Sequence, residues 1–243
     1  MSGNGSSFYE KDEFFTAFLS RRSREESPNN TMEEPVILDL IGDVTGQRVL
    51  DLGCGDGRFG STLFERGCRH YDGIDGSANM VKMAIETLYG TASTVRQINL
   101  EDWTASDEAY DLIVSRMVFH YLPDVRQLFK DIYASLSAGG QFVFSVQHPV
   151  LTSSPESAEE SGRRGSWLVD DYFKTGRRVE PWIDEEVVKY HRTTDDYFTA
   201  LTEAGFAVES LKECAPQLMH FSTRGEFHRR QRIPLFLVFS CRK

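Results

Sequence analysis

The sequence predicts a doubly wound α/β fold, in which helices cover both faces of a mostly parallel sheet. Three observations support this prediction. Short apolar strands alternate with helices of about 10–15 residues from residue 48 to residue 146, as in parallel βαβ units with right-handed crossovers. A glycine-rich turn follows the first strand. The chain closes with two consecutive strands, so the last one should be antiparallel to the sheet.

The elements follow one another in a regular order. Strands are expected in the apolar runs at residues 48–52, 71–74, 94–98, 111–115, 141–146, 206–211 and 234–240. Helices are expected between them, from the glycine-rich turn to Arg66 and over residues 77–88, 125–136 and 194–204. Glycines at positions 139, 140 and 205 end the last two helices.

Three segments lie outside this alternation. Residues 1–42 should form an N-terminal helical cap, in which Thr31 begins a helix that ends near Ile41. Residues 151–190 and 213–232 have no clear period, and we expect them to be insertions that cover a substrate. We expect residues 1–243 to form a single domain, because 40% hydrophobic residues suffice for one sizeable core.

The charge balance argues against a nucleic-acid partner. Lys and Arg number 27 against 37 Asp and Glu, which gives a net charge of −10, and a phosphate backbone repels such a protein. Two basic runs, at residues 21–24 and 228–232, are interpreted as solvated surface.

The cysteines and apolar runs predict a cytoplasmic location. Cys54, Cys68, Cys214 and Cys241 have neither CxxC nor zinc-ligand spacing, which is typical of free thiols in a reducing compartment. The polar start resembles no signal peptide, and no apolar run approaches the roughly 18 residues of a membrane span. We therefore expect no metal site and no membrane partner.

The most informative segment is residues 49–57, Val-Leu-Asp-Leu-Gly-Cys-Gly-Asp-Gly. The run from Gly55 to Gly60 fits the dinucleotide fingerprint G-x-G-x-x-G, and Asp75 lies where an NAD-binding acid would be expected. However, Asp51 ends the strand just before the turn. A carboxylate there suits the ammonium of a methionine moiety, whereas it would repel a pyrophosphate. The sequence also leaves no room for a separate substrate domain. These features favour S-adenosylmethionine over NAD.

On these residues the chain resembles the class I S-adenosylmethionine-dependent methyltransferases of the small-molecule type. The resemblance extends from about Val36 to Leu211 and includes the final strand. It implies a mixed seven-stranded sheet of order 3-2-1-4-5-7-6, with the last strand antiparallel, and S-adenosyl-L-methionine as cofactor. The cofactor-binding residues that it implies are Asp51, Gly53, Gly55, Gly57, Asp75, Gly76, Ser77, Asn99, Leu100, Glu101, Asp102, Ser115 and Arg116.

Each group of these residues has an expected role. Asp75 should accept hydrogen bonds from both ribose hydroxyls. Residues 99–102 should lie beside the adenine; the family often has an acidic residue where this chain has Asn99, so Glu101 or Asp102 could take that role instead. Ser115 and Arg116 should line the methionine part through their backbone.

Two histidines, His120 and His148, follow the fourth and fifth strands and are the candidates for a catalytic base, with a structural role as the alternative for each. The expected reaction transfers a methyl group from S-adenosylmethionine to an oxygen or nitrogen of a small metabolite. Because the sulfonium is already activated, the protein mainly supplies alignment and desolvation. The alternatives are an RNA methyltransferase, a non-catalytic S-adenosylmethionine-binding regulator and an NAD-dependent oxidoreductase. The sequence does not determine the oligomeric state.

A first prediction concerns residues 153–166, which are polar and can bury little surface to offset the entropy of ordering. Limited proteolysis of the ligand-free protein should cut this stretch first, and S-adenosylmethionine together with substrate should slow the cut. The mapping is done by mass spectrometry of the fragments. Resistance equal to that of the core would contradict the prediction.

Overall fold

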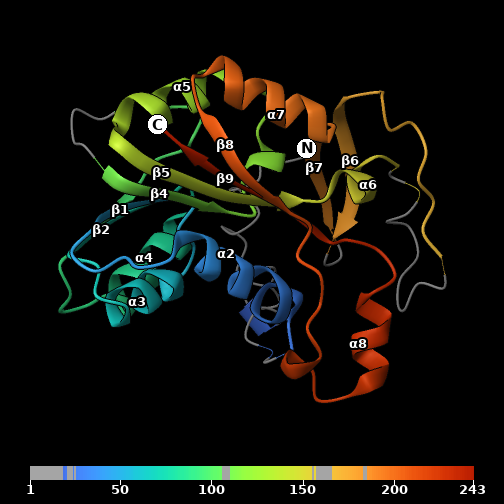
Figure 1. The fold of residues 1–243 in the computed structure, drawn as a ribbon, viewed down its shortest axis with the longest axis horizontal. Helices are drawn as coiled ribbons and strands as arrows, with labels where there is room; N and C mark the ends of the chain where they lie inside the picture. The colour runs from blue at the N-terminus through green and yellow to red at the C-terminus, as the bar shows by residue number, and fades with distance from the viewer. Residues whose placement is uncertain are drawn as a thin grey trace.

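The computed structural model describes residues 19–20, 24, 26–105, 110–154, 156, 166–182 and 185–243. Its centre is a seven-stranded sheet of order β3-β2-β1-β4-β5-β9-β8 (Figure 1). The strands are β1 (Arg48–Leu52), β2 (His70–Asp75), β3 (Ser93–Gln97), β4 (Tyr110–Arg116), β5 (Leu136–Gln147), β8 (Ala207–Lys212) and β9 (Phe236–Arg242). Numbered within this sheet alone, the order is 3-2-1-4-5-7-6, as predicted.

Within this sheet β9 runs antiparallel to the other six strands, pairing with β5 on one side and β8 on the other. The central strands are buried on both faces because helices cover each of them. One face packs against α2 (Glu34–Ile41), α3 (Arg58–Glu65) and α4 (Ala78–Thr87), and the other against α5 (Arg126–Ser135) and α7 (Thr194–Glu203) (Figure 1). The predicted doubly wound mixed sheet is therefore confirmed.

Close packing of α3 on β2 requires a glycine in the helix. A Cβ atom on Gly60 would lie 2.8 Å from Cζ of the buried Tyr71 ring, which is too close for any larger residue. Tyr71 is fully buried, and its hydroxyl reaches Asp51 at the end of β1. A glycine in this helix thus makes room for a tyrosine that holds a site residue.

The segments outside the alternation hold more regular structure than the sequence predicts. Residues 151–190 were expected to have no period, but they contain a two-stranded hairpin of β6 (Gly176–Trp182) and β7 (Glu185–His191), preceded by α6 (Pro149–Thr152). Residues 213–232 contain η5 (Leu218–His220) and α8 (Arg224–Arg230). The hairpin escaped the sequence analysis because charged residues occupy its buried face, so no apolar alternation marks it. The role of both segments as substrate lids stays a prediction, and most of residues 153–166 lies outside the described residues.

The described part of the N-terminal cap includes η2 (Asn29–Glu33) and α2. The expectation that Thr31 caps the helix is wrong, because helical structure already begins at Asn29 and the Thr31 hydroxyl donates to the carbonyl of Ser27. Among the described residues, no helix has the length and apolar character needed to cross a membrane.

A buried ion pair fastens this cap to the sheet. Nη2 of Arg116, at the end of β4, lies 2.5 Å from Oε2 of Glu33, and the Arg116 Nε donates to both oxygens of the same carboxylate. Ser145 on β5 donates its hydroxyl to Glu33 at 2.6 Å, and Glu34 binds Nη1 of Arg116 at 2.9 Å. Glu33 is fully buried, whereas the side chain of Glu34 is 30% exposed.

We therefore predict that Glu33→Ala lowers the free energy of unfolding by about 3–5 kcal/mol, because it leaves the Arg116 charge buried with a single partner. Glu34→Ala is the matched control, since it removes an exposed partner of the same guanidinium and should cost about 1 kcal/mol or less. Urea denaturation of the two variants measures the difference. Equal losses would show that burial of the pair does not matter.

Candidate functional site

The glycine-rich turn lies where β1 and β2 end, and hydrogen bonds from β2 fix its shape. The backbone N–H groups of Gly53 and Cys54 donate to the carbonyl of Ile74 at 2.7 and 2.9 Å. The carboxylate of Asp75 then accepts from the N–H of Gly55 at 3.0 Å and from that of Ser77 at 2.9 Å. Asp75 therefore binds the turn and the start of α4 together.

The three glycines of the turn have positive φ angles and serve different purposes. A Cβ atom on Gly53 would lie 2.3 Å from Cγ2 of Val118, and one on Gly57 would press on the backbone of Ala84 at 3.0 Å. At Gly55 no atom of the described residues, apart from Gly55 itself and its two chain neighbours, lies within 4 Å of the Cβ position. The backbone of Gly55 thus borders open space, as a ligand cradle requires, whereas Gly53 and Gly57 permit close packing.

Asp51, on β1 just before the turn, is almost fully buried. The hydroxyl of Tyr71 donates to its Oδ2 at 2.8 Å, and burial together with this carboxylate raises the pKa of Tyr71 well above its usual value. Tyr71 therefore stays protonated and acts as a permanent donor. The sequence does not mark Tyr71 as a site residue, because by sequence alone a tyrosine in a strand cannot be distinguished from an ordinary core residue.

The loop after β3 approaches the same edge of the sheet. The N–H of Ile98 donates to the carbonyl of Asp75 at 3.0 Å. Asn99 begins a turn, and its carbonyl accepts a hydrogen bond from the N–H of Asp102. Leu100 is buried, whereas Asn99, Glu101 and Asp102 are exposed. The structure thus brings this loop beside Asp75.

The end of β4 is tied to the end of β1. The Ser115 hydroxyl donates to the carbonyl of Leu52 at 2.7 Å, and both groups are buried. The Arg116 side chain is committed to Glu33 and Glu34 and lies over the ring of Phe59, so only its backbone is available to a cofactor. Met117 follows with a φ of +62°, a strained value for a non-glycine residue, and its N–H donates to the Ser145 carbonyl at 3.0 Å.

His120 lies in the short helix η3 (Phe119–Tyr121) and is buried. Its Nδ1 accepts a long hydrogen bond of 3.4 Å from the N–H of Gln147, which assigns the ring proton to Nε2. Burial, reinforced by the charges of Lys189 and Arg192, lowers the pKa of His120 well below 6.5. The ring is therefore a neutral donor, and its role as a catalytic base stays a prediction.

His148 caps α6 and uses both of its ring nitrogens within the chain. Its Nδ1 accepts from the N–H of Val150 at 3.2 Å, and its Nε2 lies 3.0 Å from Oε1 of Glu213. Burial lowers the pKa of His148, although Glu213 opposes this effect. These bonds account for His148 as a capping residue, and a catalytic role for it also stays a prediction.

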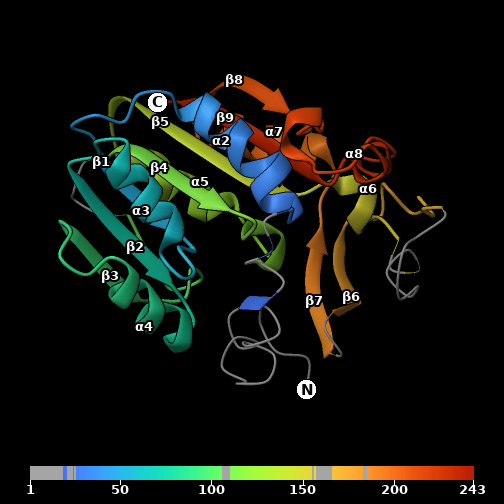
Figure 2. The ribbon, with the colours of Figure 1, turned by 90° about the horizontal axis from the view of Figure 1, so that it is seen from below.

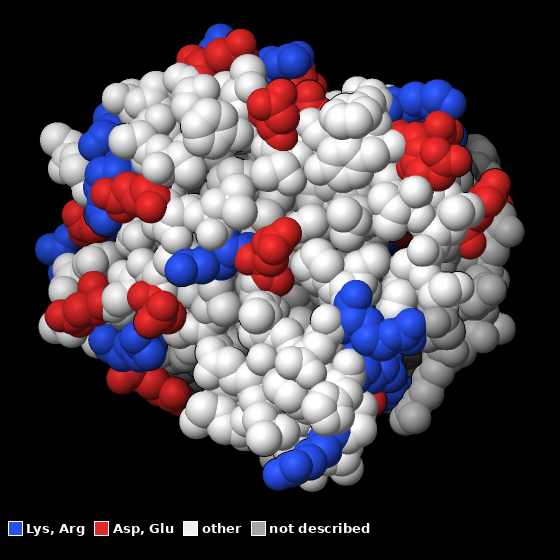
Figure 3. Space-filling view, turned by 45° about the vertical axis from the view of Figure 1, so that its right-hand side comes forward, with Lys and Arg blue, Asp and Glu red and all other residues white. Residues whose placement is uncertain are grey.

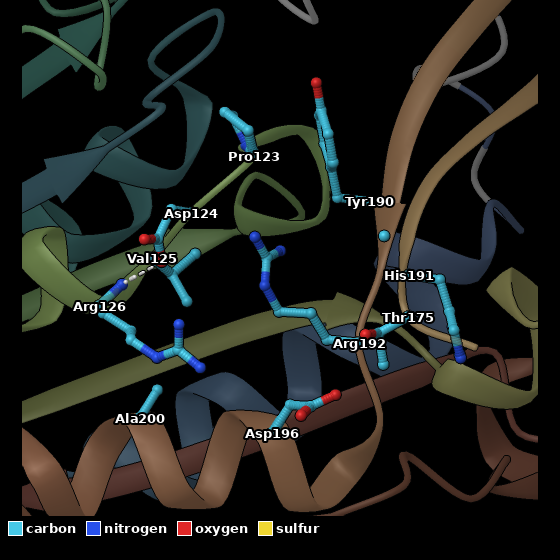
Figure 4. A pocket seen from close by; sticks show the side chains of 11 residues that line it. Pro123, Asp124, Val125, Arg126, Thr175, Tyr190, His191, Arg192, Asp196 and Ala200 are labelled. Atoms are coloured by element: carbon cyan, nitrogen blue, oxygen red, sulfur yellow. Dashed lines mark hydrogen bonds between the residues drawn. The ribbon is translucent and has the colours of Figure 1, made fainter. Parts of the chain in front are cut away.

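A polar pocket of about 230 Å³ lies beside η3, between the loop before α5, the ends of the hairpin and α7 (Figure 4). Arg192 and Asp196 line it, but both bind their own chain: Arg192 donates to the carbonyls of Phe119 and Leu122, and Asp196 accepts from the N–H of Thr193. Arg192, at the end of the hairpin, thus holds η3 against the hairpin. No group of His, Cys, Asp and Glu side chains within the described ranges could hold a metal ion.

Comparison with known proteins identifies the class to which this fold and site belong. The model of the methyltransferase domain family matches residues 13–211, so the chain belongs to this family. The predicted resemblance to the class I S-adenosylmethionine-dependent methyltransferases is therefore confirmed, and the dinucleotide interpretation of the glycine-rich turn is wrong.

Individual relatives agree with this assignment. A crystal structure of an S-adenosylmethionine-dependent methyltransferase from Mesorhizobium loti is 33% identical, with a TM-score of 0.80 over 87% of this chain and 97% of that one. A putative enzyme of the same description from Listeria monocytogenes is 31% identical, with a TM-score of 0.79 over 87% and 96%. The trans-aconitate 2-methyltransferase of Rhizobium etli is 36% identical over 59% of this chain, and the match spans 56% of that relative.

The buried state of His120 predicts a specific pH dependence of stability. Its pKa is lower in the folded protein than in the unfolded chain, so only the unfolded chain takes up this proton just below pH 6.5. The stability contributed by the neutral ring is complete above about pH 6.5 and falls below it, by at most about 1.4 kcal/mol per pH unit.

Urea denaturation between pH 7.5 and 5.5 should therefore show a shallower loss of stability for His120→Gln than for the wild type. His228→Gln, on the exposed side of α8, is the matched control and should keep the wild-type slope. Parallel pH profiles for all three proteins would mean that His120 can be protonated in the folded state.

Proposed function

We propose that this methyltransferase transfers the methyl group of S-adenosylmethionine to an oxygen or nitrogen of a small metabolite. The observation that supports it most directly is the pairing of Asp75 with the Gly55 N–H, beside open space at the Gly55 Cβ position. A carboxylate at the end of β2 is suited to accept hydrogen bonds from ribose hydroxyls, and it stands next to a backbone that a ligand can approach.

The other cofactor contacts follow from the same edge of the sheet. The buried carboxylate of Asp51 would bind the ammonium of the methionine moiety, and the backbone of Ser115 and Arg116 would border it. Gly53, Gly57, Gly76 and Ser77 shape the turn and the start of α4, and residues 99–102 would lie beside the adenine. When bound, the cofactor supplies an electrophilic methyl carbon, so the chain has to bind, orient and desolvate the acceptor.

The named relatives support a small acceptor. They include trans-aconitate 2-methyltransferases and the phosphoethanolamine N-methyltransferase 3 of Arabidopsis thaliana, which is 31% identical over 72% of this chain and 36% of its own length. The match spans just over half the length of the trans-aconitate 2-methyltransferases and about a third of the length of the phosphoethanolamine N-methyltransferase. Because these relatives act on different molecules, they favour the substrate class and no single compound.

The RNA methyltransferase alternative has less support. Glu226 pairs with Arg229 and Arg230 in the second basic run, and the Arg232 guanidinium lies over the ring of Trp167. On the face shown in Figure 3, basic and acidic side chains are interspersed. We further propose a cytoplasmic location, which the four buried free cysteines support.

The direct test is a screen of metabolites with labelled S-adenosylmethionine, with methylated products identified by mass spectrometry. Transfer to at least one metabolite supports the proposal. Cofactor binding without transfer to any metabolite would instead indicate a regulator, and salt-sensitive binding and methylation of RNA would indicate the RNA alternative.

We predict that Asp75→Ala weakens S-adenosylmethionine binding by roughly 1.5–3 kcal/mol, because it removes acceptors for ribose hydroxyls and for the Gly55 N–H. Asp75→Asn should lose nearly as much, since one amide position cannot accept a hydrogen bond. Isothermal titration calorimetry measures both, with Glu65→Ala on the exposed end of α3 as the control. Unchanged affinity in both Asp75 variants would rule out the role assigned to this carboxylate.

A further inference from the structure

The hairpin β6–β7 carries two oppositely charged residues on its inner face. Strand alternation and the pairing of Glu180 with Val187 place Glu180, Val187 and Lys189 on one face of the hairpin. Their side chains are buried: Glu180 is 3% exposed and Lys189 7%. Farther along β7 on this face, His191 binds the Thr152 hydroxyl of α6 at 2.7 Å, so the face is turned toward the body of the protein.

This face lies close to the end of the sheet at which the cofactor site is formed. Figure 2 shows the hairpin opposite the ends of β2 and β4. The helix η3 lies between the two. On one side, Val118, which precedes η3, packs against Gly53 of the glycine-rich turn. On the other side, η3 packs against β7, and the charge of Lys189 reaches His120.

Stability alone does not explain the charged pair. Nζ of Lys189 lies 2.6 Å from Oε2 of Glu180, but Oε1 of Glu180 is fully buried and has no hydrogen-bond partner in the part of the chain that the structure describes. A buried ion pair is often no more stabilising than apolar residues of the same size, and a carboxylate oxygen without a donor adds a cost. Such an oxygen calls for a donor, and the described residues do not supply one.

The neighbouring groups define what that donor can be. His120 is neutral with its proton on Nε2, and Lys189 carries only protons to donate. Among the side chains of Glu180, Lys189 and His120, Oε1 of Glu180 is therefore the acceptor that has no donor within the described residues. We propose that Glu180, held by Lys189, binds the methyl acceptor through an N–H or O–H group, so that the substrate is a small amine or alcohol.

This inference rests on the proposed methyl transfer and gives Glu180 the role first considered for the histidines. The acceptor's nitrogen or oxygen forms a bond to the methyl carbon as the bond from that carbon to sulfur breaks. The sulfur keeps the electron pair of the broken bond, and the acceptor's proton passes to Oε1 of Glu180. A carboxylate acceptor carries no such proton and would be repelled by Glu180.

The test compares three variants with the wild type. Glu180→Gln removes the charge and keeps the shape, and Glu186→Gln, exposed on the same hairpin, is the matched control. In the double variant Glu180→Met/Lys189→Met, an apolar pair replaces the ionic one. Each protein is assayed with labelled S-adenosylmethionine against amines and alcohols in one arm and carboxylic acids in the other. Cofactor affinity and melting temperature are measured alongside.

The wild type should methylate an amine or alcohol. Glu180→Gln and the double variant should transfer the methyl group about 10²–10⁴-fold more slowly while binding the cofactor within about twofold of the wild type. The double variant should also melt at or above the wild-type temperature, which separates the lost activity from lost stability. Glu186→Gln should match the wild type throughout.

Three outcomes would overturn the inference: methylation of carboxylic acids alone, no methylation of any amine or alcohol, or more than a tenth of the wild-type rate in either Glu180 variant. Loss of cofactor affinity in step with melting temperature would likewise show that the pair is structural. If the wild type does not bind S-adenosylmethionine at all, the proposed function itself fails, which is distinguishable from each of these results.

Discussion

The buried ion pair between Glu33 and Arg116 is the interaction on which the arrangement of this site depends. It joins residues 83 positions apart, and through Ser145 it also engages β5. Directly after Arg116 the chain turns sharply at Met117, and η3 follows between the glycine-rich turn and the hairpin. A charge buried without its partner is costly, so cap, sheet and η3 are held in one relative position.

The electrostatics of the edge suit a cationic methyl donor. Asp51, Asp56 and Asp75 gather around the glycine-rich turn. Burial, together with the charges of these carboxylates, raises the pKa of Cys54 well above its usual value. The thiol of Cys54 is therefore un-ionised and a poor nucleophile. The same carboxylates favour a ligand that carries a sulfonium and an ammonium. One set of charges thus serves cofactor binding and keeps a nearby cysteine inert.

The scaffold and the hairpin play different parts in the proposed reaction. The parallel strands bring Asp51, Asp75 and Ser115 to one edge, which is a property of the fold and would serve any acceptor. The hairpin contributes the buried pair of Glu180 and Lys189, to which we assign the choice of acceptor. Of the two histidines after β4 and β5, His148 uses both ring nitrogens within the chain, through Val150 and Glu213, and His120 uses its Nδ1, through Gln147.

The sequence by itself determined the doubly wound fold and the glycine-rich turn, because strand periodicity and glycine spacing are local signals. The strand order was implied by the resemblance to the methyltransferase family. Residue types at strand ends also placed Asp51, Asp75 and Ser115 at a common edge, since parallel strands end on one side. Only the tertiary structure decided that Glu33 holds Arg116, that Tyr71 holds Asp51, and that Glu180 and Lys189 form a buried pair. These contacts join segments that are distant in the sequence. A charged residue that will be buried cannot be told from a solvated one in the sequence, because only folding brings its partner to it.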